Sequence, residues 1–587
     1  MRRIRCLSLL PLLLVPALSH AGVQLVVDGV DDPLKAAVVA GVSLSQYATR
    51  DVSDAQVHRL FDRANNTEVA NALQPYGYYA AHSTGTIKHV GKDWQVTLHV
   101  VPGEPVNVTS VDIQLDAVAA ALKPVRSARR TVEKLKGQRL DDAAYESARD
   151  GLNNALTANG YLDAKLTVHR VEVHRGDRTA AIHLAWEVGR RYRYGKVDFE
   201  GSQFHPGFLD RYVPFKSGDY FDQNQLLSLQ QALNGADYFS AVNVMPEIDS
   251  AKDGVVDVKV QLLPAKRTIY TSGLFVGTDT GFGIRGGMER RWVNKYGHKW
   301  KNDIVLAQRL KTVTSQYSIP LPGDNQRSLN FGITYRDANT VTSQSRTLEL
   351  VANETELWHE WVRTVGLHAL TGTFSVGKTP NEPESTPGVE HGHSTLIYAE
   401  GSLSRKVADN LDFVRRGWSL SFDARSTASD FLSTARFSEL SADAKWIRAF
   451  WRNNRLILRG DIGHVWTSNF EALPPQLRFF AGGDQSIRGF PFQALGPQNS
   501  YGRVIGGDSL VIASATVEHY FTPRWGIATF VDAGNAFNGT AVHPKIGTGV
   551  GVRWRSPVGM VRVDIGTPIN DAQRHGIELH LVVGPDL

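Results

Sequence analysis

Few residues of this chain have the types and spacing that catalysis or metal binding requires. His359 and Glu360 begin the HExxH pattern of zinc proteases, but Arg363 stands where the pattern needs its second histidine. His391 and His393 carry imidazoles that bind metals. However, they fall in a stretch rich in Pro, Glu and Gly that predicts a loop, with no supporting cluster of ligands. Neither pattern predicts a metal site.

The glycine-rich segment GTGVGVRW, residues 547–554, does not predict a phosphate site. Its glycines fall on a strand pattern that no helix follows, whereas a phosphate loop leads into the N-terminus of a helix. The sequence also lacks a Gly-x-Ser-x-Gly elbow with convincing partners. We therefore expect no enzyme activity, no cofactor and no metal, and a hydrolase remains the alternative from another class of function.

Arg488 is the charged residue whose setting needs an explanation. It lies in FFAGGDQSIRGFPF, residues 479–492, after a double glycine and between an isoleucine and a Gly-Phe pair. A guanidinium pairs bidentately with a carboxylate, so Arg488 is either a solvated loop charge or is held by an acid. Which of the two applies depends on the elements around it.

Residues 22 to about 264 contain three copies of one α+β pattern. A helix-like stretch in each copy leads to a tyrosine, and two alternating strands follow. The tyrosines recur about every 80 residues and are Tyr78, Tyr161 and Tyr238. Gly77 and Gly160 precede the first two and fit the C′ position of a helix, where left-handed backbone favours glycine. Each copy predicts a small domain of strand, helices, strand and strand.

From about residue 267 onward the pattern changes to strict alternation. In WSLSFDARS the residues Trp418, Leu420 and Phe422 share one face, and polar residues share the other. SLNFGITYR, VRVDIG and IELHLVV repeat the pattern. About 320 residues, at about 20 per strand and turn, correspond to about 16 strands, too many for one soluble sandwich. We predict a 16-stranded antiparallel transmembrane β-barrel.

The N-terminus and the cysteine count predict export. Residues 1–21, MRRIRCLSLLPLLLVPALSHA, have the basic start, the apolar stretch and the small residue at Ala21 of a secretory signal peptide. Cys6 is the only cysteine and lies inside this leader, so the mature chain has no disulfide. Without the three leader arginines, the 64 basic residues fall to 61 against 59 acidic ones, which gives no reason to expect a nucleic-acid partner.

These motifs resemble those of a known superfamily. GGDQSIRGFPFQALGP is similar to the sixth-loop signature of the outer-membrane insertase superfamily that includes BamA. The motif residues are Gly482, Gly483, Ile487, Arg488, Gly489 and Phe490. The three repeats resemble POTRA domains, and three of them before a 16-stranded barrel are similar to the TamA branch. The implied parts are a signal peptide at 1–21, POTRA domains at 22–102, 103–188 and 189–264, and a barrel at 265–587.

The resemblance also implies a partner for Arg488. In this superfamily the sixth loop folds into the lumen, and its arginine meets an acid on the barrel wall. By position this acid is Asp532, with Glu518 on the preceding strand as the second candidate. Asp532 alternates with the apolar Val531 and Ala533, so it should face inward. Such a charge-assisted contact contributes about 1.5–3 kcal/mol, enough to hold a loop but not to build a barrel.

The two strands that meet where the barrel closes are predicted to form a weak seam. The last strand, GIELHLVVGPDL, is interrupted by Gly584 and Pro585, and proline donates no ladder hydrogen bond. The first strand, RTIYTSGLFVG, contains Gly273 and Gly277. We expect this seam to open sideways and to offer unpaired backbone to an incoming strand.

The resemblance implies a function in protein assembly. TamA-like proteins help other outer-membrane proteins, autotransporters among them, to insert and fold without ATP. We therefore expect an outer-membrane protein with periplasmic POTRA domains and with unfolded outer-membrane proteins as clients. Its first POTRA domain is expected to contact a TamB-like partner that spans the periplasm. The alternative is a two-partner-secretion-type pore that exports one exoprotein, for which two POTRA domains and a plug helix would be expected.

Overall fold

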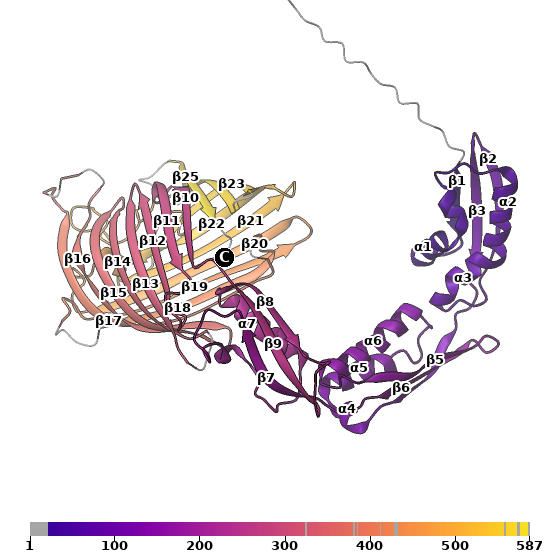
Figure 1. Ribbon diagram of the computed structural model, residues 1–587. Coiled ribbons are helices and arrows are strands. Elements are labelled where there is room, and N and C mark those ends of the chain that lie inside the picture. The colour runs from indigo at the N-terminus through magenta and orange to yellow at the C-terminus, as the bar shows by residue number, and fades with distance from the viewer. Residues whose placement is uncertain are drawn as a thin grey trace, which may run out of the picture. The chain divides into compact units, whose positions relative to one another are not determined.

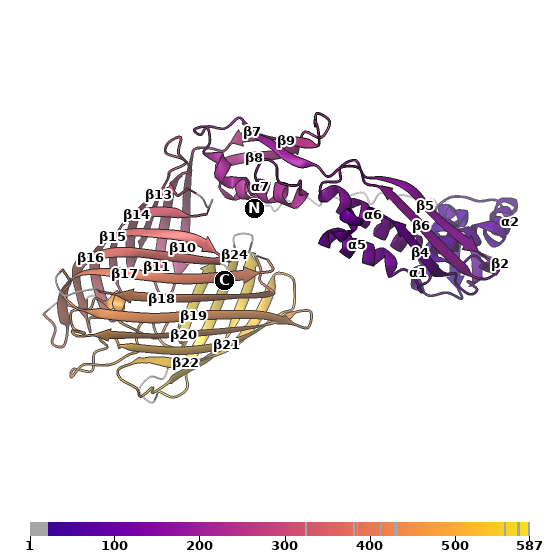
Figure 2. The same ribbon diagram turned by 90° about the horizontal axis from the view of Figure 1, so that it is seen from below.

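The computed structural model describes residues 22–322, 326–379, 382–383, 385–410, 412–427, 432–556, 559–571 and 576–584. The expected signal peptide lies outside these residues. The chain forms two compact units, one built mainly from the residues up to Asp198 and the other from the C-terminal strands. The second unit also includes Phe199–Pro214 and Leu229–Asn243. Figures 1 and 2 show helices and small sheets in the N-terminal half and long strands in the C-terminal half.

Three small sheets occupy the N-terminal half, each with three strands in the orders β1-β3-β2, β4-β6-β5 and β7-β9-β8. In the first two, the middle strand pairs in parallel with the first strand and antiparallel with the other. The strands are β1 (Val23–Asp28), β2 (His82–Val90), β3 (Asp93–Val101), β4 (Asn107–Gln114), β5 (Lys165–His174), β6 (Thr179–Glu187), β7 (Arg193–Glu200), β8 (Phe239–Pro246) and β9 (Val255–Pro264). The predicted three α+β domains are confirmed.

Helices lie between β1 and β2, between β4 and β5 and between β7 and β8 in the chain. The α-helices are α1 (Asp32–Gly41), α2 (Asp54–Arg63), α3 (Val69–Leu73), α4 (Ala117–Ala121), α5 (Lys123–Glu133), α6 (Asp142–Ala158) and α7 (Gln223–Gly235). Shorter helical turns are η1 (Ser43–Tyr47), η2 (Ala64–Glu68), η3 (Gln74–Tyr76) and η4 (Leu209–Tyr212), and η5 (Pro475–Leu477) lies in the C-terminal half. Asp141 caps α6, because its carboxylate accepts a hydrogen bond from Ala144 N at 3.0 Å. Within the described ranges, no helix has both the length and the apolar character that crossing a membrane requires.

Gly77 and Gly160 lie just beyond the helices of the first two domains in left-handed backbone, with φ of 83° and 96°. The tyrosine after each glycine turns back onto its helix. The amide of Tyr78 donates to Leu73 O at 3.2 Å, and the amide of Tyr161 donates to the carbonyl of residue 156 at 3.1 Å. This is the hydrogen bond that ends a helix in a Schellman motif.

In the third domain an aspartate takes the place of the glycine. Asp237 has φ of 62° and precedes Tyr238, which is 1% exposed. The Asp237 carboxylate accepts a hydrogen bond from Arg291 Nε at 2.8 Å, and the Tyr238 hydroxyl donates to Gly297 O at 2.6 Å. Both partners follow the second barrel strand. The strained aspartate therefore ties this segment to the turn beside it.

Gly77→Ala is expected to destabilise the contact between the first domain and the second domain, to which Leu140 belongs. The new Cβ would lie 2.3 Å from Leu140 O, in addition to the strain of φ 83°. Gly137 is a matched control, since its φ is 82° and an added Cβ meets nothing within 4 Å. We expect Gly137→Ala to cost about 1–2 kcal/mol from backbone strain and Gly77→Ala to cost clearly more. Limited proteolysis during heating, followed on the N-terminal fragments, measures both; equal effects would contradict the clash.

Sixteen strands form one antiparallel sheet in sequence order from β10 to β25. They are β10 (Thr268–Gly277), β11 (Gly281–Arg290), β12 (Lys299–Ala307), β13 (Leu310–Pro320), β14 (Ser328–Asn339), β15 (Ser343–Trp358), β16 (Trp361–Val376), β17 (Glu390–Ala408), β18 (Arg416–Ser426), β19 (Phe437–Phe450), β20 (Asn454–Thr467), β21 (Ser509–Tyr520), β22 (Trp525–Phe537), β23 (Lys545–Ser556), β24 (Gly559–Pro568) and β25 (Glu578–Gly584). The sheet curls into a barrel, so that β10 and β25 lie side by side (Figure 1). The predicted strand number is confirmed.

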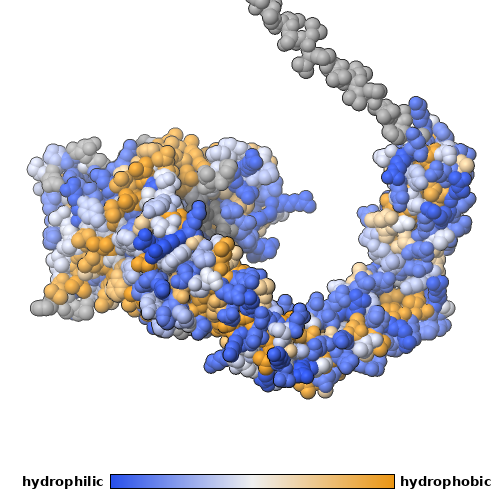
Figure 3. Space-filling view, in the orientation of Figure 1, coloured by the Kyte–Doolittle hydropathy of each residue, from blue (hydrophilic) through white to orange (hydrophobic). Residues whose placement is uncertain are grey.

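The outer face of the barrel carries large apolar side chains. Leu274 is 75% exposed, Leu367 is 61% exposed and Val550 is 62% exposed. Hydrophobic side chains cover patches over these strands in Figure 3. Charged residues such as Asp532, which is 0% exposed, alternate with them and face the interior. Exposed apolar surface over so many strands is stable only against lipid.

Candidate functional site: loop six and the seam

Loop six, residues 468–508, is the long connection between β20 and β21. Gly482 and Gly483 turn its backbone with φ of 98° and 104°, and the Gly483 amide donates to Phe490 O at 3.0 Å. This turn presents the Arg488 side chain to the inner wall of the barrel. Ile487 is fully buried beside it.

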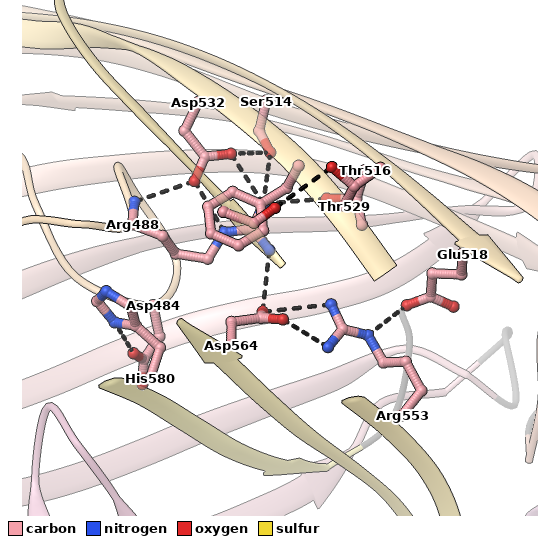
Figure 4. A network of polar contacts seen from close by, with 12 residues as sticks. Asp484, Arg488, Ser514, Thr516, Glu518, Thr529, Asp532, Arg553, Asp564 and His580 are labelled. Carbon is pink, nitrogen blue, oxygen red and sulfur yellow. Dashed lines mark hydrogen bonds and ion pairs between the residues drawn. The ribbon is translucent and has the colours of Figure 1, made fainter. Parts of the chain in front are cut away.

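The guanidinium of Arg488 is held by three strands of the wall (Figure 4). It pairs bidentately with Asp532 on β22, where Nε–Oδ2 and Nη2–Oδ1 are both 2.8 Å. Nη1 donates to Asp564 on β24 at 3.0 Å, and Nη2 donates to Thr516 on β21 at 3.0 Å. The Phe530 ring lies 3.6 Å from the guanidinium carbon and adds a cation–π contact. Arg488 is therefore not a solvated loop charge.

The Arg488 pair belongs to a longer row of buried charges. Three arginines alternate with three acids in the order Arg455, Glu518, Arg553, Asp564, Arg488 and Asp532. The closest N–O distance between consecutive members is 2.6–3.0 Å, and each residue is at most 7% exposed. Opposite charges balance within the row, so each ion is compensated by its neighbours. Removing one member takes a buried counter-charge away from each of its neighbours.

Glu518, the second acid considered for Arg488, pairs with other residues. Its carboxylate accepts from Arg455 Nε at 2.6 Å and from Arg553 Nε at 2.7 Å. The strand register explains this placement, because Asp532 lies opposite Ser514, four residues before Glu518 on β21. Alternation places both acids on the inner face but does not say how far along the barrel each lies.

Glycines on the wall make room for loop six. A Cβ at Gly547 of β23 would lie 1.8 Å from Arg488 O, and one at Gly566 of β24 would lie 2.6 Å from Gly489 N. Gly489 itself has φ of 94°, and its own Cβ would lie 2.8–3.0 Å from the Thr567 backbone. The loop backbone thus rests directly on the backbone of two strands. The first glycine of GTGVGVRW is explained by this close approach, whereas a Cβ at Gly549 or Gly551 would instead meet Ile565 or Asp564 of β24.

Three residues of the site were not foreseen from the sequence: Asp564, His580 and Asp484. Asp564 pairs with Arg488, and His580 accepts a hydrogen bond from the Gly489 amide at its Nε2 atom, 2.9 Å away. The alternation in VRVDIG and IELHLVV already places Asp564 and His580 on the polar face of their strands. The alternation therefore indicates that both side chains face the barrel interior, but it does not identify their partners.

The ends of the 16-stranded sheet meet at the seam. Among the described residues, no strand ladder joins β10 to β25, and β25 has 7 residues. Gly277 lies across from β25, since an added Cβ would be 3.7 Å from Leu581 O, whereas Gly273 has open space at its Cβ position. Gly584 ends β25, and Pro585 lies outside the described residues.

Asp279, in the turn after β10, makes barrel stability depend on pH. Burial and, secondarily, the nearby charge of Asp484 raise its pKa from the ordinary 3.8 to about 7. The folded barrel therefore binds an extra proton between about pH 4 and pH 7, and the stability this proton contributes is lost as pH rises through about 7. We expect the unfolding temperature, followed by heat-modifiable gel mobility, to fall between about pH 5 and about pH 8.

Asp279→Asn separates this effect from other titrations. The variant cannot ionise at that position, so its unfolding temperature should fall less than that of the parent over the same pH range. Equal slopes for the two proteins would assign the pH dependence to other groups.

The two histidine-containing patterns considered for metal binding lie on a barrel strand and in a turn between two barrel strands. His391 and His393 lie at the start of β17 rather than in a loop, so that expectation was wrong. The alternation of the strand extends further toward its Pro-rich flank than composition suggested. His359 and Glu360 form the turn between β15 and β16, with φ of 47° and 68°.

Sixteen lipid-facing antiparallel strands, a loop anchored inside them and three POTRA-like sheets before them define an outer-membrane β-barrel protein with periplasmic N-terminal domains. The Omp85 superfamily domain matches residues 275–584, more than half of the chain, and the chain belongs to this superfamily. A family described as POTRA domain TamA domain 1 matches residues 24–102. A POTRA family described as surface antigen variable number repeat matches residues 192–262.

Known proteins are similar to this chain at low identity. The outer membrane protein assembly factor BamA of Nitratidesulfovibrio vulgaris is 22% identical over 423 residues, 69% of this chain and 52% of that protein. BamA of Neisseria meningitidis serogroup B is 18% identical over 193 residues, 31% of this chain and 24% of that protein. The chain thus spans about half the length of the first and about a quarter of the second. BamA from Haemophilus ducreyi lacking POTRA domains 1–3 has a similar fold, with a TM-score of 0.66 at 17% identity over 81% of this chain and 98% of that one.

Proposed function

We propose that this protein promotes the insertion and folding of other outer-membrane β-barrel proteins through the seam between β10 and β25. It acts as an assembly factor and not as an enzyme, and it needs no ATP. The driving free energy comes from the folding of the client and from the burial of its apolar face in lipid.

The seam is the observation that carries this proposal. In the described part of the chain, β10 and β25 are the only barrel strands with a ladder on one side alone. Their free edges present unpaired N–H and C=O groups, which in lipid must find partners. A client strand that adds to either edge supplies them by β-augmentation. A conventional closed barrel offers no such edge.

The TamA-like branch is favoured within the superfamily. The family that matches residues 24–102 is described as the first POTRA domain of TamA, and three POTRA-like sheets precede the barrel. Our proposal therefore includes autotransporters among the clients. It also assigns a TamB-like periplasm-spanning protein to the first POTRA domain, residues 22–102.

The proposal is tested with the purified full chain in liposomes. An unfolded autotransporter barrel is added, and its folding is followed by heat-modifiable mobility and protease resistance. Liposomes with the protein should fold the client faster than empty liposomes or liposomes with a porin. Failure to accelerate folding, with export of a soluble exoprotein instead, would favour the two-partner-secretion-type pore.

A reversible block tests the role of the seam separately. The double variant Gly277→Cys/Leu581→Cys places a cysteine on each side of the seam, in a chain whose only natural cysteine is Cys6. The oxidised form should lose client folding and recover it on reduction, whereas each single variant should remain active. Full activity of the oxidised form would contradict a lateral route.

A further inference from the structure

A buried acid of loop six contacts both sides of the seam, through the turn after β10 and through β25. Thr278 Oγ1, in the turn after β10, donates to Asp484 with distances of 2.8 and 2.9 Å to its two carboxylate oxygens. His580 Nδ1, on β25, lies 2.6 Å from Asp484 Oδ1. The side chains of Asp484 and His580 are 6% and 4% exposed. We name Thr278, Asp484 and His580 the seam cluster.

The hydrogen-bond roles within the seam cluster are consistent. His580 Nε2 accepts from the Gly489 amide at 2.9 Å, so the opposite nitrogen, Nδ1, is the donor to Asp484. The Thr278 hydroxyl donates to Asp484 and accepts from Leu581 N at 3.3 Å, which is a direct contact between the two sides of the seam. Each polar atom in the cluster thus has a partner of the correct kind.

We propose that loop six keeps the seam closed, because Asp484 binds the first and last strands of the barrel together. This inference rests on the proposed function in one respect, that the seam is the route by which clients are inserted. A client or partner that displaces loop six removes Asp484 from the seam and frees both edges at once. The loop thereby couples occupation of the lumen to opening of the wall.

The geometry around the cluster favours this role over simple loop packing. Between the two strands no ladder hydrogen bonds are present in the described residues, so side chains and loop six must supply the polar contacts at this end. His580 joins the cluster to Gly489, which follows Arg488, and Arg488 is fixed to β22 and β24. The seam is therefore attached through loop six to β24, which neighbours β25, and to β22, three strands from β25.

Hydrogen–deuterium exchange of the full chain in lipid nanodiscs, without any client, tests the inference. In Asp484→Ala the amides of β25 should exchange about tenfold faster than in the parent, because hydrogen bonds to a charged group are lost from the closed state only. The amides of β19, far from the seam in strand order, should not change. Asp508→Ala is the matched control, since Asp508 is another loop-six acid whose side chain contacts Ser509 and Gly539 instead.

Thr278→Val tests the hydrogen bond between Thr278 and Asp484 by removing its donor. Valine keeps the shape but removes the hydroxyl, so β25 exchange should again accelerate, and combining it with Asp484→Ala should add little. Unchanged β25 exchange in Asp484→Ala, or equal acceleration in Asp508→Ala, would overturn the inference. Because no client is present, either result leaves the proposed assembly function to be judged by the liposome assay.

Discussion

Replacing Arg488 by alanine is expected to release loop six from the lumen while the barrel stays folded. The substitution removes the bidentate pair with Asp532, the bond to Asp564 and the contact with Phe530. It also leaves the Asp532 carboxylate buried without its cation. Breaking one partner of a buried pair costs about 3–5 kcal/mol, far more than an exposed ion pair contributes. The loop can avoid this cost by leaving the wall, whereas the strands are held by their ladders.

Exposure of a buried loop residue measures this release. Ile487 is 0% exposed, so a cysteine placed there should resist a membrane-impermeant maleimide in the parent. In the Arg488→Ala background the labelling rate should rise about 100-fold or more. Arg488→Lys should give an intermediate rate, because an ammonium does not form the same fork. Heat-modifiable mobility should persist in both.

Arg503→Ala is the control for this experiment. Arg503 is another arginine of loop six, but it pairs with Glu382 at a site where both side chains are more than 20% exposed. Its removal should leave the Ile487→Cys site protected. If the Ile487→Cys site is labelled as slowly in the Arg488→Ala background as in the Arg503→Ala background, the buried ion pair does not hold the loop.

Glu518→Ala is expected to destabilise the barrel itself. Glu518 is 0% exposed and lies between Arg455 and Arg553, which are each 1% exposed. Its loss removes the buried carboxylate that contacts both Arg455 and Arg553. We expect a loss of about 3–5 kcal/mol in the free energy of unfolding, measured by urea titration in detergent with heat-modifiable mobility as the readout.

Two further variants show whether charge or shape is responsible. Glu518→Gln keeps the side-chain volume and one acceptor but removes the charge, so it should be nearly as destabilising as alanine. Glu354→Ala removes a barrel-wall glutamate of 29% side-chain exposure that pairs with Arg327, and it should leave the urea midpoint unchanged. Equal midpoints for Glu518→Ala and Glu354→Ala would show that the buried row of charges adds no stability.

Local patterns in the sequence were sufficient for the architecture. The period of about 80 residues predicts the three N-terminal domains, and strict alternation over about 320 residues predicts the barrel and the inward side of Asp532. These predictions succeed because helix and strand periodicities depend on which residues must be buried within one element. The motif around Arg488 also marks the loop that matters.

The pairing within the site was decided by the tertiary structure. Alternation states the face on which Glu518, Asp532, Asp564 and His580 lie, but the depth of each depends on strand register and on the fold of loop six. Register places Asp532, and not Glu518, beside Arg488, and it brings His580 of the last strand to Asp484 of the loop. Contacts within the site join residues up to 303 positions apart and follow from barrel closure. No local pattern records that closure, because it is a property of all sixteen strands together.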